Sequence, residues 1–152
     1  MHHIPVLGMM DFLGPAIAAL GFILGMSLVK EPTRRHFNAI VVAGVSGAYL
    51  SGGFGLWELW YPVAGTAIAY LGLRSHRYIG LAWLMHAAWD LFHHFYGNPI
   101  WPFMPTSSFG CTIFDSVLAT WFLAGASALV RRAVERGPGS PQGQAGGLSW
   151  AG

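Results

Sequence analysis

Charged residues are scarce in this chain. Only 9% of its 152 residues are Asp, Glu, Lys or Arg, whereas an average soluble domain is about 25% charged. Hydrophobic residues make up 54%, and the mean hydropathy is +0.49. So few charges can hardly cover the surface of a soluble globule of this size. The composition therefore predicts a multi-pass integral membrane protein.

Cysteines and basic runs are also nearly absent. Cys111 is the sole cysteine, which excludes an intrachain disulfide and a cysteine-based zinc cluster. The net charge is only +2, and no run of Lys or Arg is longer than two residues. A nucleic-acid-binding surface needs a basic stripe, so we expect no nucleic-acid partner. The N-terminal segment lacks a basic region, so we expect no cleaved signal peptide.

Five apolar segments approach the roughly 20 residues that a transmembrane helix needs. The predicted spans are 11–29, 37–55, 56–73, 78–97 and 109–130. In the third, either the helix begins near Leu56 and bends at Pro62, or residues 54–61 lie along the membrane surface. The sequence thus predicts an all-α bundle of five transmembrane helices within residues 1–136. Residues 137–152, rich in Gly, Pro, Ser and Gln, are expected to form a disordered cytoplasmic tail.

The basic residues predict the orientation of this bundle. In the five-span arrangement, all eight fall on one side: Lys30, Arg34, Arg35, Arg74, Arg77, Arg131, Arg132 and Arg136. Lys and Arg collect in cytoplasmic loops. We therefore expect a cell-membrane protein with its N-terminus outside and its C-terminus in the cytoplasm, in contact with the lipid bilayer.

Small residues recur every four positions along the second predicted span. They are Ala39, Ala43, Gly47, Ser51 and Gly55. In lipid, small side chains allow two helix backbones to approach closely. The stripe predicts a helix–helix contact, either within one chain or between two copies in a homo-oligomer.

Ionisable residues inside the predicted spans are costly and mark candidate functional sites. Four acidic residues lie in the outer half of the bundle: Asp11, Glu58, Asp90 and Asp115. In the fourth span, the spacing of His86, Asp90, His93 and His94 places all four on one helix face. Counting about 1.5 Å per residue brings Glu58 and Asp115 to the depth of His93. We therefore expect one polar site in the outer half.

This combination of imidazoles and carboxylates is typical of Zn²⁺ or non-haem iron sites. The candidate metal ligands are His86, Asp90, His93, His94 and Asp115, and the candidate catalytic acids or bases are Asp90, Asp115 and Glu58. A bound metal would activate water for attack on a carbonyl or phosphoryl group. The hydroxyls of Ser107 and Ser108 are candidates for binding a substrate headgroup. These residues favour a metal-dependent hydrolase, or another enzyme, acting on a lipid or apolar substrate.

Other interpretations of the same residues remain open. The histidines and acids could satisfy one another in a structural hydrogen-bond network. They could also form the proton pathway of a small proton-coupled carrier or channel-like subunit, or belong to a structural or partner-binding membrane protein. Cys111, one helical turn before Asp115, is expected to be a small buried hydrophobe.

Two stretches of sequence carry a family resemblance. HAAWDLFHH at 86–94 and NPIWPFMPTSSFGCTIFD at 98–115 resemble small bacterial and fungal integral membrane proteins grouped as a domain of unknown function. This resemblance covers most of residues 10–132 and implies several membrane spans but no activity. A looser resemblance to intramembrane hydrolases related to alkaline ceramidases implies a zinc held by histidines, with Asp and Ser nearby. Those hydrolases differ in having seven helices and histidines on two of them.

Overall fold

The computed structural model describes residues 4–47 and 52–126, and this part of the chain folds into five α-helices. They are α1 (Met10–Leu28), α2 (Thr33–Val45), α3 (Trp57–Gly72), α4 (His76–Tyr96) and α5 (Ser107–Leu123). Within the described residues, the only strand-like pairing is one isolated bridge between Trp101 and Met104. The prediction of an all-α fold is confirmed for these residues.

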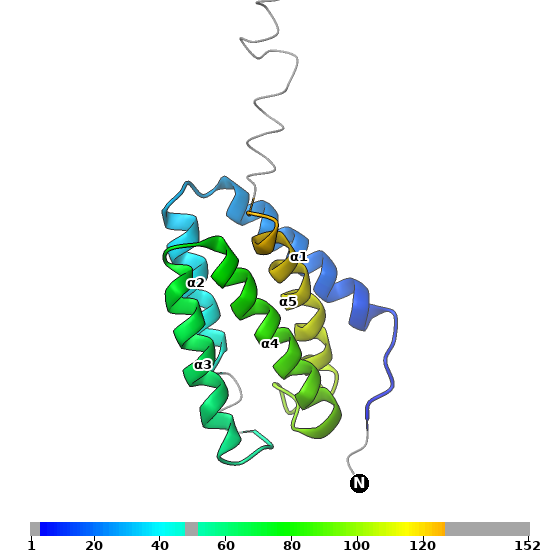
Figure 1. Ribbon diagram of the computed structural model, residues 1–152. Coiled ribbons are helices and arrows are strands. Elements are labelled where there is room, and N and C mark those ends of the chain that lie inside the picture. Colours follow the sequence, from blue (N-terminus) through cyan, green and yellow to red (C-terminus); the bar gives the residue numbers. More distant parts are fainter. Residues whose placement is uncertain (1–3, 48–51, 127–152) are drawn as a thin grey trace, which may run out of the picture.

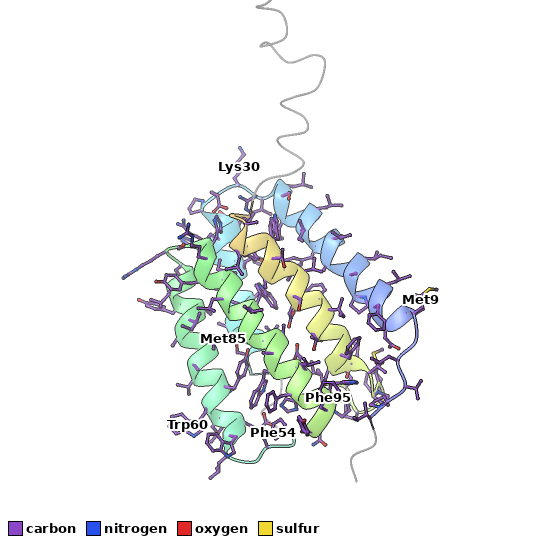
Figure 2. The ribbon with its side chains drawn as sticks, turned by 45° about the vertical axis from the view of Figure 1, so that its right-hand side comes forward. Met9, Lys30, Phe54, Trp60, Met85 and Phe95 are labelled. Carbon is purple, nitrogen blue, oxygen red and sulfur yellow. The ribbon has the colours of Figure 1, made fainter. Side chains whose placement is uncertain are left out.

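The helices run alternately up and down, and α4 lies at the centre (Figure 1). It packs against α5 on one side and α3 on the other, α1 covers the outer side of α5, and α2 contacts α3 and α4. The α1–α2 and α3–α4 connections lie at one end, and residues 52–56 and 97–106 lie at the opposite end. Figure 2 labels Lys30 at the first end and Phe54 and Trp60 at the other. Every Lys or Arg within the described ranges lies at the Lys30 end.

The second predicted span, 37–55, was wrong in extent. Helix α2 ends at Val45 and, at 13 residues, is only about 20 Å long. Beyond it, residues 52–56 form bends and turns. Gly53 and Gly55 have φ of +90° and +59°, values that glycine adopts far more readily than other residues. Two of the small residues that suggested close helix packing, Gly47 and Gly55, therefore lie outside the helix.

The predicted small-residue stripe is consequently not one helical face. Ala39 and Ala43 lie on α2, Gly47 follows its end, and Gly55 lies in a turn. Ser51 lies outside the described residues. A Cβ added to Gly72 would lie 3.5 Å from the Cβ of Ala39, so this part of the stripe contacts α3 of the same chain. Its use in a homo-oligomer stays a prediction.

The remaining helices begin within two residues of the positions expected from the sequence, and α1, α3 and α4 also end within two residues of them. The predicted fifth span, 109–130, was wrong in extent, because α5 ends at Leu123 and residues 124–126 lie outside the helix. Helix α3 begins at Trp57 and continues through Pro62, which is the first of the two alternatives for this segment. Helix α4 begins after Ser75, whose hydroxyl accepts a hydrogen bond from the Arg77 amide. The last residues of the predicted fifth span, 127–130, and the predicted tail at 137–152 lie outside the described residues.

The surface of α1 is strongly apolar. Only Ala19, Ile23 and Ser27 are buried on this helix, whereas Ile17 and Leu28 are each 65% exposed. Among the described helices, α1 is the one long and apolar enough to cross a membrane, and α5 is apolar but shorter. An exposed apolar face of this kind indicates contact with another apolar medium or protein.

A polar cluster closes the Lys30 end of the bundle. The Glu31 carboxylate accepts hydrogen bonds from the Arg34 side chain at 2.7 and 2.8 Å and lies 3.0 Å from His76 Nε2. The Arg34 guanidinium also lies 5.9 Å from the ring centre of Trp121 on α5. Partial burial alone would raise the pKa of Glu31, but Arg34 and His76 outweigh it and hold that pKa below its usual value. Glu31 thus joins the start of α2 to the start of α4.

Close backbone packing of α4 on α5 leads to a first prediction. A Cβ at Gly80 would lie 2.9 Å from the backbone nitrogen of Leu123, whereas one at Gly21 would meet nothing within 4 Å. Gly80→Ala should therefore force the two helices apart and lower the free energy of unfolding by about 1–3 kcal/mol. Gly21→Ala, the matched control, should be neutral or stabilising by up to about 1 kcal/mol. Equal thermal stability of the two variants in detergent would contradict this packing.

The Glu31 cluster leads to a pH-dependent prediction. Because the folded-state pKa of Glu31 is depressed, its stabilisation is present above the unfolded pKa and disappears as pH falls through the folded pKa. Glu31→Gln should lower the melting temperature by a constant amount above about pH 5, and the difference should shrink below about pH 4. Thermal melts between pH 3 and 8 measure this, with the exposed Arg77→Gln as a control. A difference that grows on acidification would refute the ion pair.

Candidate functional site

One face of α4 carries four buried polar residues. His86, Asp90, His93 and His94 are between 0% and 3% exposed. Their spacing of four, seven and eight residues puts them on the side of the helix that faces its neighbours. Asp115 on α5 and Glu58 on α3 are each 3% exposed and face this side. Such burial of ionisable groups requires partners for each of them.

The ring of His86 is held by the end of α2. Its Nε2 atom lies 2.9 Å from the carbonyl oxygen of Val45. A carbonyl oxygen only accepts hydrogen bonds, so Nε2 carries the proton and donates. The Val45 carbonyl is available because α2 ends at this residue, and the last carbonyls of a helix have no partner within it. The early end of α2 therefore orients His86.

The other nitrogen of His86 faces two carboxylates. Nδ1 lies 2.7 Å from Oδ2 of Asp115 and 3.1 Å from Oδ2 of Asp90. One potential ligand atom from each of the three residues falls within 4.8 Å of the others. We call His86, Asp90 and Asp115 the histidine–aspartate centre. A separation of 2.7 Å is a hydrogen-bond distance, and two ligands on one tetrahedral metal stand roughly 3.3 Å apart.

A second polar pair lies further along α4. His93 Nε2 is 3.3 Å from Oε1 of Glu58, and His93 Nδ1 is 3.2 Å from the carbonyl oxygen of Asn98. Oε1 of Glu58 also accepts a hydrogen bond of 3.0 Å from the amide of Phe54. Gly97 makes this arrangement possible, because a Cβ there would lie 2.6 Å from His93 Nδ1. This pair repeats the pattern of His86: a backbone carbonyl on one ring nitrogen and a carboxylate on the other.

The single site expected from the sequence is thus two clusters. Counting residues along straight helices placed Glu58, His93 and Asp115 at one depth, but it says nothing about which side chains meet laterally. The ring of His94, the third candidate imidazole on α4, packs against the rings of Phe95 and Phe109 at 5.1 and 5.3 Å.

Ser107 and Ser108 organise the connection between α4 and α5. The Ser107 hydroxyl accepts a hydrogen bond of 3.1 Å from the Trp101 amide, and that of Ser108 accepts one of 3.3 Å from the Ile100 amide. Ser107 also lines an apolar groove of about 630 Å³ between α1 and α5, with Asp11 at its edge. Binding of a headgroup by these hydroxyls stays a prediction.

Cys111 lines the same groove and is half-buried. It precedes Asp115 by one helical turn, so the groove approaches the histidine–aspartate centre along α5. No further role is evident for this thiol.

Several buried polar groups escaped the sequence interpretation. Arg34 and Asn38 are 6% and 0% exposed, and Ser46 is 1% exposed. Their spacing along α2 at intervals of four and eight residues is a signal that could have identified them. The carbonyls of Val45 and Asn98 had no such signal, because every residue has a carbonyl and its availability depends on where a helix ends.

Comparison with known proteins places the chain in a family. Residues 10–128 match the model described as "Family of unknown function (DUF6010)". Searches of curated proteins and of solved structures found no match. The match supports the resemblance to an uncharacterised family and brings with it no activity.

Proposed function

Because the chain belongs to the DUF6010 family of unknown function, we propose its activity from the site itself. The protein is a multi-pass membrane protein that binds a divalent metal, zinc or non-haem iron, at His86, Asp90 and Asp115. A metal held by these residues would supply a Lewis acid for the activation of water in the hydrolysis of a lipid or another apolar substrate. The single observation that carries this proposal is the orientation of His86, with Nε2 on a backbone carbonyl and Nδ1 on two carboxylates.

This orientation is typical of histidine ligands. A metal-bound histidine almost always donates its second N–H to a carbonyl or carboxylate, which fixes the tautomer and ring direction. The Val45 carbonyl would play that part here. Three protein ligands with an open fourth position are what a catalytic zinc requires. Binding requires the Nδ1–Oδ2 separation between His86 and Asp115 to widen from 2.7 Å to roughly 3.3 Å.

Charge balance also favours a divalent cation. A proton on His86 Nδ1 gives one positive charge against two carboxylates, which leaves a net negative charge on buried groups. A buried, unbalanced charge is strongly disfavoured. A divalent metal at Nδ1 would bring the centre to neutrality, as would a second proton shared by the two aspartates. Oδ1 of Asp90 has no hydrogen-bond partner among the described residues, and we assign it the role of general base.

The distribution of residues supports the membrane location. Large apolar side chains are exposed along the helices while three acids and three imidazoles are buried between them, the reverse of a soluble domain. The described basic residues lie at one end of the bundle, as the positive-inside rule requires of the cytoplasmic side. In a membrane, the non-helical backbone after Val45 is tolerated where protein side chains satisfy it, and His86 does so.

A second candidate is a proton-coupled carrier. The Glu58–His93 pair lies about one helical turn from Asp90, so titratable groups form a file from the Phe54 end toward the middle of the bundle. Beyond His86 the α4 face continues with the buried apolar residues Trp83, Ala82 and Ile79. A row of titratable residues that ends at an apolar core favours a site reached from one end of the bundle over a proton pathway open to both ends.

Topology tests the membrane part of the proposal. A reporter fused after Arg136 should be cytoplasmic, and a reporter inserted near Pro102 should be external, because the α4–α5 connection lies opposite the basic end. Paired alkaline phosphatase and fluorescent-protein fusions measure this. Both reporters on one side of the membrane would remove the five-span model.

Metal analysis tests the site. Purified protein in detergent should contain about one zinc or iron per chain, and His86→Ala or Asp115→Asn should weaken binding by roughly 100-fold or more, beyond the effect of an outer-shell partner. His94→Ala, on the same helix but outside the centre, is the matched control and should keep its metal. His93→Ala should also keep it, because His93 faces Glu58.

Other results of this experiment separate the alternatives. If the wild type contains no metal after zinc or iron loading, and Asp115→Asn only lowers stability by about 1–3 kcal/mol, the centre is a structural hydrogen-bond network. Metal-free protein that carries protons into sealed vesicles would favour the carrier.

A further inference from the structure

An aromatic pocket lies beside the Glu58–His93 pair and outside the histidine–aspartate centre. It has a volume of about 440 Å³ between the start of α3 and the second half of α4. Six aromatic side chains line it: Phe54, Trp57, Trp60, Tyr61, Trp89 and Phe92. The volume lies within the range of about 300–1,000 Å³ found for small-molecule sites. Figure 2 shows Phe54 and Trp60 at the end of the bundle opposite Lys30.

The inner wall of this pocket is fixed by ring contacts. Tyr61 and Trp89 are stacked, with centroids 4.9 Å apart and planes at 7°. The ring of Phe54 lies 5.5 Å from that of Trp89. At the rim, Trp57 and Trp60 are 72% and 66% exposed. The pocket therefore combines packed aromatic rings on its inner wall with two exposed tryptophans at its rim.

A buried acid lies directly behind this wall. The ring of His93, which faces Glu58, is 4.7 Å from the ring of Phe54 and 5.3 Å from that of Trp89. The amide of Phe54 itself donates to Oε1 of Glu58, and Oε2 of Glu58 has no hydrogen-bond partner among the described residues. The Glu58 carboxylate is thus separated from the cavity by the rings of His93, Phe54 and Trp89. Aromatic faces are themselves negative, so both features favour a cation in the pocket.

The lining also selects the kind of cation. A primary ammonium has three N–H donors that must be accepted, whereas the polar atoms of the lining side chains are indole N–H groups and one phenol. A quaternary ammonium has no donor to satisfy, and aromatic cages are its usual recognition site. We propose that this pocket binds the trimethylammonium group of a choline-type lipid headgroup.

The surroundings of the pocket point to a lipid as the source. Leu59 and Val63 on α3 and Tyr96 on α4, the helices that border the pocket, are 55%, 65% and 68% exposed. Tryptophan and tyrosine at such positions lie at the headgroup level of a bilayer. This step depends on the membrane location in the proposed function but not on the metal, so each can fail without the other.

Binding of a small cation to the purified protein tests the pocket chemistry. Choline is titrated into protein in maltoside detergent, followed by tryptophan fluorescence and calorimetry, beside its uncharged isostere 3,3-dimethylbutan-1-ol. Choline should bind at least about tenfold more tightly than the isostere. Trp60→Leu, which keeps an apolar side chain at an exposed position, and Glu58→Gln should each weaken choline binding by roughly 3- to 30-fold. Trp101→Leu, outside the pocket, is the matched control.

A nanodisc experiment tests the lipid source. Spin-labelled phosphatidylcholine should be retained at the protein surface in preference to spin-labelled phosphatidylglycerol, and Trp60→Leu should abolish the preference. Equal affinity for choline and its isostere, or no effect of Trp60→Leu, would show an ordinary apolar pocket and overturn the proposal. Choline binding without preference for phosphatidylcholine would assign the pocket to a water-soluble cation and overturn the lipid assignment. Metal content measured on Trp60→Leu should stay that of the wild type.

Discussion

The hydrogen bond from His86 to the Val45 carbonyl is the constraint on which the polar interior depends. It joins the end of α2 to the middle of α4 at 2.9 Å and aims the opposite ring nitrogen at Asp115 on α5. One imidazole therefore connects three helices. If α2 continued for another turn, the amide four residues on would occupy the Val45 carbonyl. His86 would then bury an N–H without an acceptor, which costs about 1–3 kcal/mol. The short second helix and the histidine–aspartate centre are thus one structural feature.

Two buried histidines have the same arrangement of partners. His86 and His93 each have a backbone carbonyl on one nitrogen and a carboxylate on the other. In both cases the carbonyl belongs to a residue at the end of a helix or just past it, because carbonyls inside a helix are already occupied. These two buried imidazoles gain partners from helix ends, while many outward side chains are apolar. This inside-out distribution fits an apolar surrounding better than water.

Periodicity in the sequence predicted much of this fold. Five helices and a polar face on α4 follow from apolar segment lengths and from residue spacing. The residue at which α2 ends could not be predicted in this way, because the small residues after Gly44 suit close helix packing and helix termination equally well. The sequence also did not predict that the buried polar residues divide into two clusters. Depth along a helix follows from residue number, but lateral contact depends on how the helices are rotated. The burial of Asn38 followed a visible four-residue spacing and could have been predicted.

Access to the histidine–aspartate centre is constrained by how the helices pack. His86, Asp90 and Asp115 are each no more than 3% exposed, so the proposed substrate would reach them only where two helices separate. Between α4 and α5 the backbones are in near contact at Gly80, which opposes separation there. By contrast, α1 packs mainly against α5, through the narrow stripe of Ala19, Ile23 and Ser27. The groove between these two helices already reaches Cys111, one turn from Asp115. Movement of α1 is therefore the route that disturbs the fewest buried contacts, and it would admit an apolar molecule from the side of the bundle.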